Sequence, residues 1–420
     1  MDEFASIRYW TANRQPQEWL RARGVAVGIG DDAAVVDLAP ESPVGQAGEW
    51  QCLLTVDTMV ETVHFTDATM SDEDIGYKAL AASISDIAAM GGLPRHALVS
   101  VSLPPSCGPE RMRRLYDGLY ACADTYGVAI VGGDTTSTPS QLVVAVTVVG
   151  AVEAGKAVRR AGARAGDTVF VTGLPGQSAA GLHFLLAAAQ ARARAGLDGP
   201  VPLAAAADAE VDGLVAAHRR PRPSVRAGRL LAARGTCRSL NDVSDGLASE
   251  AWELAEASGV SIVLREAALP CSGSMAAYGR RVGVKPLDWI LYGGEDYVLI
   301  GTIDPQDAQA AKAALNAEGI PFYAIGEVEA ASVPGVWLER DGDWHSAAED
   351  HSQDQPGLDK LEQDMQTLDR QERYRGEDKP EQRGFASGQS KVNRPRRVAL
   401  RKAGFNHFEK ITGESNADHK

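Results

Sequence analysis

The chain has little of what marks secreted, membrane-spanning or nucleic-acid-binding proteins. Its five cysteines, at positions 52, 107, 122, 237 and 271, form no CxxC pair and no cluster with histidine. An odd, scattered set of cysteines fits reduced thiols better than a disulfide framework. No apolar run reaches eighteen residues, and the N-terminal segment MDEFASIRYW has no apolar signal-peptide core. We therefore expect a soluble, cytoplasmic protein that does not enter a membrane.

Basic residues are also fewer than acidic residues. With 42 Lys and Arg against 56 Asp and Glu, the formal net charge is 42 − 56 = −14. A nucleic-acid-binding surface would be basic, so nucleic acid is not an expected partner. Phosphate ligands remain compatible with this charge, because a bound cation reverses the sign of the local field. A length of 420 residues with 44% hydrophobic residues fits two or three globular domains.

What the chain does have is one pattern that occurs six times: an apolar run that ends in one or two carboxylates. The six segments are GIGDD (Asp31, Asp32), LLTVD (Asp57), SISD (Asp86), AIVGGD (Asp134), SLNDVSD (Asp242, Asp245) and LYGGED (Glu295, Asp296). One such ending would be an ordinary turn, but six suggest strand and helix ends that converge on one pocket. Closely spaced carboxylates cannot all stay ionised unless cations lie between them. Hard oxygen ligands favour magnesium, so the pattern predicts a site with several metal ions that handles phosphates.

Apolar spacing predicts an α/β (or α+β) protein of two domains. Helices are expected over residues 71–90 and 109–126, within a first domain that has at least five strands and covers residues 1–155. A second α/β domain is expected over residues 156–349, with Ser178 as the N-cap of its first helix.

The sequence beyond the second domain changes character. Residues 350–400 are polar and poor in aliphatic side chains, which predicts a disordered insertion. A short amphipathic helix is compatible with the apolar spacing over residues 358–368. Residues 401–420 would then form a closing segment and tail.

Two glycine-rich segments resemble motifs that they do not complete. GAVEAGKA (150–157) has the glycines and lysine of a Walker A loop, but Ala157 stands where the magnesium-binding hydroxyl is needed. GLPGQSAAG (173–181) resembles a nucleophile elbow but lacks a glycine two residues after Ser178. For the second segment we expect a strand-to-helix turn whose amides meet a phosphate.

Two basic segments leave alternatives open. HRRPRPSVR (218–226) fits either a solvated start of a helix or a contact with an anion. RPRRVALRK (394–402) could bind an acidic partner, although a solvated linker is the favoured interpretation.

The ordered set of carboxylate segments resembles that of the thiamine-monophosphate kinase family. This family belongs to the superfamily that also holds aminoimidazole ribonucleotide synthetase and selenophosphate synthetase. The resemblance runs from about residue 4 to about residue 348 and is carried by GIGDDAAVV, TVDTMVETVHF, DIGYKALAASISDIAAMGG, VGGDTTS, RRAGARAGDTVFVTGLPGQSAAGL, HRRPRPS, NDVSDGL and YGGEDYVL. GFNHF (404–408) resembles the segment with which the family closes its fold, here displaced by the polar stretch.

The resemblance implies a role for each matched position. The magnesium ligands would be Asp32, Thr55, Asp57, Asp86, Asp134, Asp242 and Asp245. The ATP contacts would be Gly133, Asp134, Arg160, Ser244 and Tyr116. The thiamine-phosphate contacts would be His64, Glu295 and Phe405. The resemblance also implies an aminoimidazole ribonucleotide synthetase-like fold and a homodimer in which N-terminal domains that bind ATP and magnesium pair their sheets.

The implied reaction passes the γ-phosphoryl group of ATP in line to thiamine monophosphate and gives thiamine diphosphate. A phosphate monoester has its second pKa near 6, so the acceptor is already anionic at neutral pH and no general base is expected. Two other functions are considered: another ATP-dependent synthetase of the superfamily, and a nucleotide-binding regulator without turnover. GIGDD is not preceded by the cysteine that selenide chemistry calls for, and intact aspartates at every segment disfavour a regulator.

Overall fold

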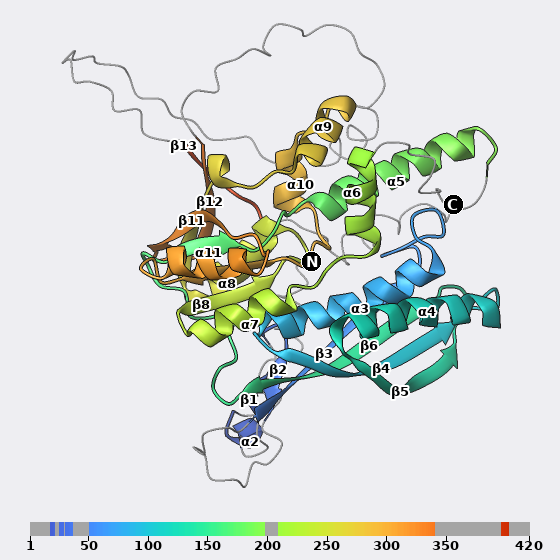
Figure 1. Cartoon of the computed structure of the whole chain (residues 1–420), viewed down its shortest axis with the longest axis horizontal. Coiled ribbons are helices and arrows are strands. Elements are labelled where there is room, and N and C mark those ends of the chain that lie inside the picture. The colour runs from blue at the N-terminus through green and yellow to red at the C-terminus, as the bar shows by residue number, and fades with distance from the viewer. Residues whose placement is uncertain are drawn as a thin grey trace, which may run out of the picture. The chain divides into compact units, whose positions relative to one another are not determined.

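The computed structural model describes residues 17–21, 25–28, 30–36, 50–197, 209–340 and 396–402. They form two mixed α/β domains, one around each of two sheets (Figure 1). The expected α/β class with two domains is confirmed. Among the described helices, none combines the length and the apolar character needed to cross a membrane.

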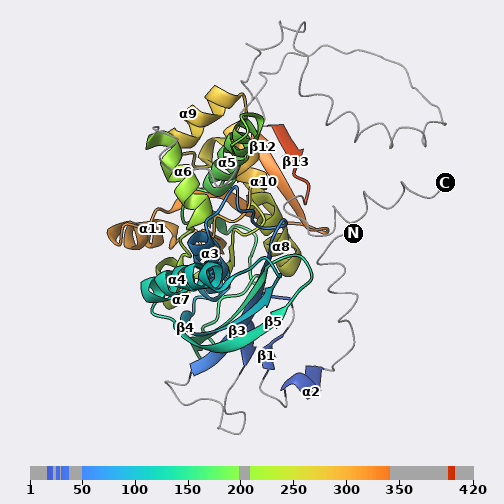
Figure 2. The ribbon, with the colours of Figure 1, turned by 90° about the vertical axis from the view of Figure 1, so that its right-hand side faces the viewer.

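The first domain is a six-stranded mixed sheet with two long helices on one face (Figures 1 and 2). In sheet order its strands are β1 (Val25–Val27), β2 (Ala34–Val36), β3 (Trp50–Val60), β6 (Val143–Glu153), β4 (Leu93–Leu103) and β5 (Ala129–Ser137). Its helices are α2 (Gln17–Arg21), α3 (Asp72–Ala89) and α4 (Pro109–Tyr126). Only β4 and β5 run parallel; the other neighbouring strands are antiparallel.

The central elements of this domain follow from their sequences. Strand β6 is rich in β-branched residues, and its alternate side chains pack beneath α3 while the others point away. Helix α3 begins at a capping box between Ser71 and Asp74, and it stops at the glycine pair after Met90. Helix α4 has Pro109 in its first turn and ends at Gly127, whose φ of 66° suits glycine. The helices predicted over 71–90 and 109–126 are therefore confirmed.

The other face of this sheet carries exposed apolar side chains. Val56 on β3 and Leu98 on β4 both pair with Thr147 of β6, so they point to the same side of the sheet. Their exposed fractions are 59% and 43%, and Val131 on β5 reaches 60%. No described helix covers this face (Figure 2). It forms an open apolar surface, which we call the open sheet face.

The second domain is built on a seven-stranded mixed sheet. In sheet order its strands are β13 (Arg396–Ala399), β12 (Gly335–Arg340), β9 (Val260–Arg265), β11 (Tyr323–Ala330), β7 (Thr168–Val171), β10 (Leu299–Ile303) and β8 (Cys237–Asp242). Its helices are α5 (Gln177–Arg194), α6 (Ala209–Arg219), α7 (Val225–Arg234), α8 (Leu247–Ser258), α9 (Gly273–Val282), α10 (Pro286–Tyr292) and α11 (Ala308–Ala317), with a 3₁₀ turn, η2 (Glu266–Ala268).

Helices pack on both faces of this second sheet. Val169 and Val171 of β7 join a core with α5, α6 and α8, whereas Phe170 between them joins a core with α7 and α11. This alternation explains why the short strand is apolar at every position. The sheet edge formed by β8 lies next to α3 of the first domain. The end of β8 is thereby placed beside the last turn of α3.

The joint between the two domains depends on a close approach of α3 and α7. A Cβ atom added to Gly228 of α7 would lie 2.1 Å from the carbonyl oxygen of Ala88 of α3, far inside contact distance. Arg229 of α7 donates from Nη1 to the carbonyl of Gly91 at 2.8 Å. Glycine at position 228 therefore sets how closely the last turn of α3 meets the second domain.

Three local predictions for the second domain are wrong. Ser178 is not an N-cap, because α5 begins at Gln177 after Gly176. The run WILYGGEDYVLIGTI (289–303) predicts a strand or turn from its first residue, but WILY ends helix α10 and strand β10 begins only at Leu299. The described part of 394–402 is not a solvated linker: β13 joins the sheet, Leu400 is buried, and Arg397 pairs with Glu329.

The basic segment 218–226 is only partly the solvated start of a helix: it leads into α7 and exposes Arg220, Arg222 and Arg226, but its first two residues are not solvated. His218 and Arg219 are buried, and Arg219 donates from Nε to the carbonyl of Thr69 at 2.7 Å. Arg220 pairs with Asp74 at 2.7 Å, at the start of α3. The segment thus holds the second domain against the first. The proposed helix over 358–368 and residues 350–395 of the predicted disordered insertion lie outside the described residues. The prediction of disorder over 350–400 is wrong for residues 396–400, which form β13 and the buried Leu400.

Candidate active site

Three carboxylates from distant parts of the chain meet where the two domains join. Asp32 lies between β1 and β2, Asp86 in the last turn of α3, and Asp242 at the end of β8. Each offers one oxygen, and the three oxygens lie within 4.8 Å of one another. The convergence predicted from the apolar runs is therefore seen for these three segments. Such spacing lets three carboxylates bind one cation together.

The electrostatics of this group favour a cation. Burial, together with the charges of Asp57 and Asp242, raises the pKa of Asp86 well above its ordinary value. Burial and the nearby Asp32 raise the pKa of Asp242 to about 8. Asp32 Oδ2 is buried and has no hydrogen-bond partner among the described residues. Several buried carboxylates that repel one another, one of them with an unused oxygen, fit a divalent metal ion.

Hydroxyl groups hold two of these carboxylates in place. Thr55 faces α3 from strand β3, and its Oγ1 donates to Asp86 Oδ2. Ser85, next to Asp86 on α3, donates from Oγ to Asp242 Oδ2 at 2.6 Å. Thr55 is expected as a metal ligand, and the structure shows it as a hydrogen-bond partner of Asp86.

Arg160, expected as an ATP contact, lies against the carboxylate group. Its guanidinium pairs with Asp32, with Nε 3.1 Å from Oδ1, and Nη1 lies 3.7 Å from a carboxylate oxygen of Glu253. Its Nε also lies 3.2 Å from Asn241 Oδ1 on β8. Arg160 therefore orients Asp32 from the side of the second domain.

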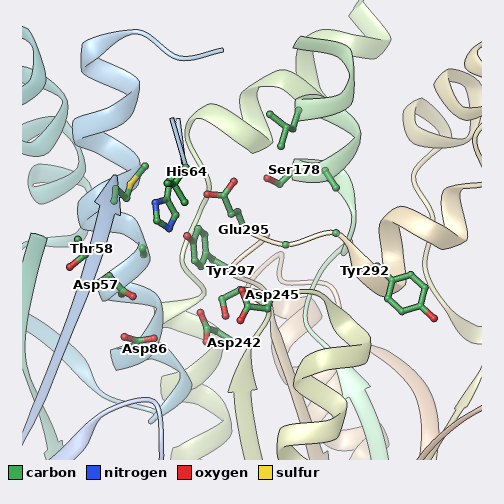
Figure 3. A pocket seen from close by; sticks show the side chains of 18 of the residues that line it. Asp57, Thr58, His64, Asp86, Ser178, Asp242, Asp245, Tyr292, Glu295 and Tyr297 are labelled. Carbon is green, nitrogen blue, oxygen red and sulfur yellow. The ribbon is translucent and has the colours of Figure 1, made fainter. Parts of the chain in front are cut away.

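A cavity of about 610 Å³ opens beside the carboxylate group (Figure 3). Its polar lining includes half of the fourteen expected residues: Asp57, His64, Asp86, Asp242, Ser244, Asp245 and Glu295. Its apolar lining comes from Met59, Val63, Leu182, Leu186 and Tyr292. His64 and Glu295 lie together at one end, and the aspartates lie at the other (Figure 3). The cavity can hold a ligand that is anionic at one end and partly apolar at the other.

Glu295 sits in a strained loop that the structure fixes from several sides. Its φ is 63°, a left-handed value that is unusual for glutamate. Its N–H donates to the carbonyl of Ser244 at 2.6 Å. Its carboxylate pairs with Lys78 of α3 at 2.8 Å, an interaction that the sequence did not predict. The available signal was a single lysine within the small and apolar run GYKALAAS of a predicted buried helix.

The backbone amides at the start of α5 were expected to bind a phosphate, but they donate hydrogen bonds to a carboxylate of the protein itself. Asp296 accepts hydrogen bonds from the N–H of Gly176 at 2.5 Å and of Ser178 at 2.9 Å. Burial raises the pKa of Asp296 to about 7, while these N–H groups act in the opposite direction. The carboxylate of Asp296, from the loop between α10 and β10, thus occupies the helix N-terminus that we assigned to a ligand.

Ser178 and His218 do not form a hydrolytic pair. Ser178 Oγ lies 3.1 Å from His218 Nδ1, but the carboxylate of Glu295 approaches the same nitrogen at 3.4 Å. A catalytic triad needs the nucleophile and the acid on opposite ring nitrogens. His218 Nε2 is buried without a hydrogen-bond partner among the described residues, so this arrangement does not activate Ser178.

Three described residues of the expected set, Asp134, Gly133 and Tyr116, lie neither in the cavity lining nor against the carboxylate group. Asp134 of β5 belongs to the row Thr58–Ala145–Ser100–Asp134 across the sheet, on the open sheet face. Three strand spacings separate it from Thr58, about 14 Å between backbones. Gly133 lies beside it, and Tyr116 lies on α4. Phe405 lies outside the described residues.

Comparison with known proteins gives consistent matches over both domains. Residues 30–152 match the family model described as AIR synthase related protein, N-terminal domain, and residues 164–339 match the corresponding C-terminal domain. A protein of Bacillus subtilis (strain 168) named thiamine-monophosphate kinase is 40% identical over 341 residues, which cover 81% of this chain and 95% of that protein.

Two solved structures agree with this match. The structure described as AaThiL complexed with AMPPCP and TMP is 30% identical, with a TM-score of 0.64, and the match covers 80% of this chain and 93% of that one. The thiamine-monophosphate kinase of Stenotrophomonas maltophilia K279a is 31% identical, with a TM-score of 0.61, covering 80% and 95%.

Proposed function

Since the chain belongs to the thiamine-monophosphate kinase family, we propose that it transfers the γ-phosphoryl group of ATP to thiamine monophosphate and forms thiamine diphosphate. The resemblance found in the carboxylate segments is confirmed by these relatives. One structural observation supports the activity most directly. The cavity joins a buried carboxylate group suited to cations with a separate end formed by His64 and Glu295.

The carboxylates of Asp32, Asp86 and Asp242 are the groups that would hold magnesium. Asp57 and Asp245 line the same end of the cavity and would serve ions nearer the phosphates. Magnesium would neutralise the phosphate oxygens of donor and acceptor, whose mutual repulsion is the main obstacle to phosphoryl transfer. Arg160 and Ser85 keep the carboxylates oriented while this charge is bound.

The histidines of the site suit binding rather than proton abstraction. His64 Nδ1 accepts a hydrogen bond from the N–H of Val60 at 2.9 Å, so the proton of the neutral ring lies on Nε2. Burial, and then the charge of Lys78, lowers the pKa of His218 to about 3. Neither ring is needed as a base, because the acceptor phosphate is already ionised.

The two ends of thiamine monophosphate suit the two ends of the cavity. Its phosphate would lie toward the aspartates and their cations, and its cationic thiazolium ring toward the carboxylate of Glu295. The apolar wall from Leu182 and Leu186 would face the ring system. Phe405 is retained as a ring contact on the family resemblance alone.

We also propose that the chain acts as a homodimer through the open sheet face. Exposed apolar side chains on β3, β4 and β5 are unfavourable in water and are typical of an interface. Asp134 lies on this face, so a paired sheet would enclose it with the neighbouring Gly133. This arrangement would let both residues act as ligands although they lie apart from the cavity of their own chain.

The assignment is tested with purified protein, ATP, magnesium and thiamine monophosphate, with thiamine diphosphate detected by mass spectrometry. Asp57→Asn and Asp134→Asn should each lower kcat by about 10²-fold or more at saturating magnesium. Asp117→Asn, an exposed carboxylate on α4, is the matched control and should retain activity. Near wild-type turnover in Asp57→Asn would remove that residue from the metal site, and absence of product from the wild type would reject the function.

A further inference from the structure

Lys78 is a charged side chain in a place where only a specific role stabilises it. It lies in the middle of α3, has no exposed surface, and is among the largest of the fully buried side chains that the structure describes. Its nearest neighbours along the helix, from Ile75 to Leu80, are uncharged, and Asp74 lies one turn before it. An ammonium group taken out of water is strongly unfavourable unless a charged partner compensates it. The identity of that partner therefore indicates what the lysine does.

The partner is the carboxylate of Glu295, from the other domain. Lys78 Nζ donates to Glu295 Oε2 at 2.8 Å and lies 3.4 Å from His218 Nδ1. Burial lowers the pKa of His218 to about 3, and an ammonium group can only donate, so His218 Nδ1 is the acceptor in its contact with Lys78. Ser178 Oγ also approaches this nitrogen, at 3.1 Å. The lysine is thus held between one anion and one neutral acceptor.

The contacts of Glu295 use only one of its two oxygens. Within the described residues, Lys78 and His218 both approach Oε2. About a quarter of the Glu295 side chain, 26%, is exposed, and the residue lines the cavity. Figure 3 shows its carboxylate beside His64 at that end of the cavity. Oε1 is therefore the oxygen left for a ligand.

The backbone of Glu295 gives the carboxylate little freedom to move. Its N–H is held by Ser244, and the N–H of Tyr297 is held by Val243 at 2.9 Å. Tyr297 also has a positive φ, of 52°. Two left-handed residues in one loop persist only where surrounding contacts compensate their strain. Lys78 is the charged contact that reaches this loop from the first domain.

We propose that Lys78 is a positioning residue that keeps the Glu295 carboxylate ionised and turned toward the cavity, so that its second oxygen can meet the cationic ring of thiamine monophosphate. This rests on the proposed function. Lys78 itself does not line the cavity, so it acts through Glu295 rather than on the substrate. A purely packing role would not require charge, because methionine has a similar shape and avoids the unfavourable burial of an ammonium group.

The test compares Lys78→Met, Lys78→Gln and Lys78→Arg with Glu295→Gln and with the double variant Lys78→Met/Glu295→Gln. We expect Lys78→Met to raise the KM for thiamine monophosphate about tenfold or more, with the KM for ATP changed less than about twofold. Lys78→Arg should restore much of the loss. The double variant should be no worse than Glu295→Gln by more than about twofold, because the lysine acts through that carboxylate. Lys312→Met, which removes an exposed lysine from α11, is the control.

Other outcomes would overturn the inference. They are an unchanged KM for thiamine monophosphate in both neutral variants, or equal increases in both KM values together with an additive double variant. Lys78→Gln keeps a hydrogen-bond donor without the charge and takes the place of Lys78→Met should that variant not fold. A wild type that makes no thiamine diphosphate rejects the proposed function, whereas an active wild type with unaffected variants rejects only the role of Lys78.

Discussion

At the scale of single residues, the site is a set of carboxylates whose burial opposes their ionisation. Asp242 and Asp86 both have raised pKa values, first because they are buried and then because other aspartates lie nearby. Ser85 and Thr55 donate hydrogen bonds to them, which offsets only part of this repulsion. The buried carboxylates therefore lower the free energy of unfolding of the metal-free protein, and bound cations would raise it.

This imbalance predicts how the stability of the metal-free protein depends on pH. Asp242 has an ordinary pKa of 3.8 and a folded pKa of about 8, so between these values the folded state binds more protons than the unfolded state. Stability must then fall as pH rises through this window. Between pH 3 and 6.5 the lowered pKa of the buried His218 makes stability rise with pH. The fall in stability caused by Asp242 is therefore expected to be seen most clearly between pH 6.5 and 8.

In EDTA we therefore expect a lower Tm at pH 8 than at pH 6.5, measured by calorimetry or fluorescence. Saturating magnesium should raise the Tm more at pH 8, because the cation binds the ionised carboxylates. Asp242→Asn should lose much of the pH dependence. A Tm in EDTA that is flat or rising over this range would contradict the unfavourable charge at the site.

At the scale of elements, helix α3 connects the two domains with the site. It carries Lys78, Ser85 and Asp86, and its last turn meets α7 at Gly228. The position of Asp86 is thus set by the contact between the two helices as well as by its own sequence. Small residues at this crossing allow the backbones to approach closely.

Gly228→Ala should separate the two helices. The added Cβ would lie 2.1 Å from the Ala88 carbonyl oxygen, two residues from Asp86, so the helix must shift. We expect a loss of about 1–3 kcal/mol in the free energy of unfolding, as for other overpacked sites, and a lower kcat. Gly213→Ala on α6, where a Cβ meets nothing within 4 Å, should be neutral or stabilising by up to ~1 kcal/mol. Denaturant unfolding of both variants measures the difference, and equal effects would contradict the close approach.

At the scale of the whole molecule, the two sheets are covered differently. The second sheet has helices on both faces, whereas the first has them on one face only. The exposed side chains of Val56, Leu98 and Val131 belong to the uncovered face. A second copy of the chain is the partner that would cover this face under the proposed homodimer.

Leu98→Lys should therefore convert a wild-type dimer to a monomer. A charge placed in the centre of an apolar interface is strongly unfavourable, and a weakening of the dimer by about 10²-fold or more is expected. Sedimentation velocity gives the oligomeric state. Val333→Lys is the control, because Val333 is 74% exposed and lies away from the sheet face, between β11 and β12. A wild type that sediments as a monomer would reject the homodimer.

Much of this organisation could be predicted from the sequence because it depends on local patterns. The capping signals and apolar spacing predict α3 and α4, and the alternating valines predict β6. The carboxylates that end apolar runs predict a metal site, since Asp32, Asp86 and Asp242 do converge. Ser178 was misassigned because its hydroxyl suits an N-cap, while the distant Asp296 performs the capping.

The sequence by itself determined the two α/β domains, the family and the kind of chemistry, because composition, periodicity and ordered motifs are properties of the chain. Only the tertiary structure decided which carboxylates share a cavity and which partners they have. Lys78 and Glu295 are 217 residues apart and meet at 2.8 Å, while Asp134 lies on the other side of its sheet from the buried α3. Strand register and the packing of α3 on α7 set these relations, and both depend on contacts between residues far apart in the chain.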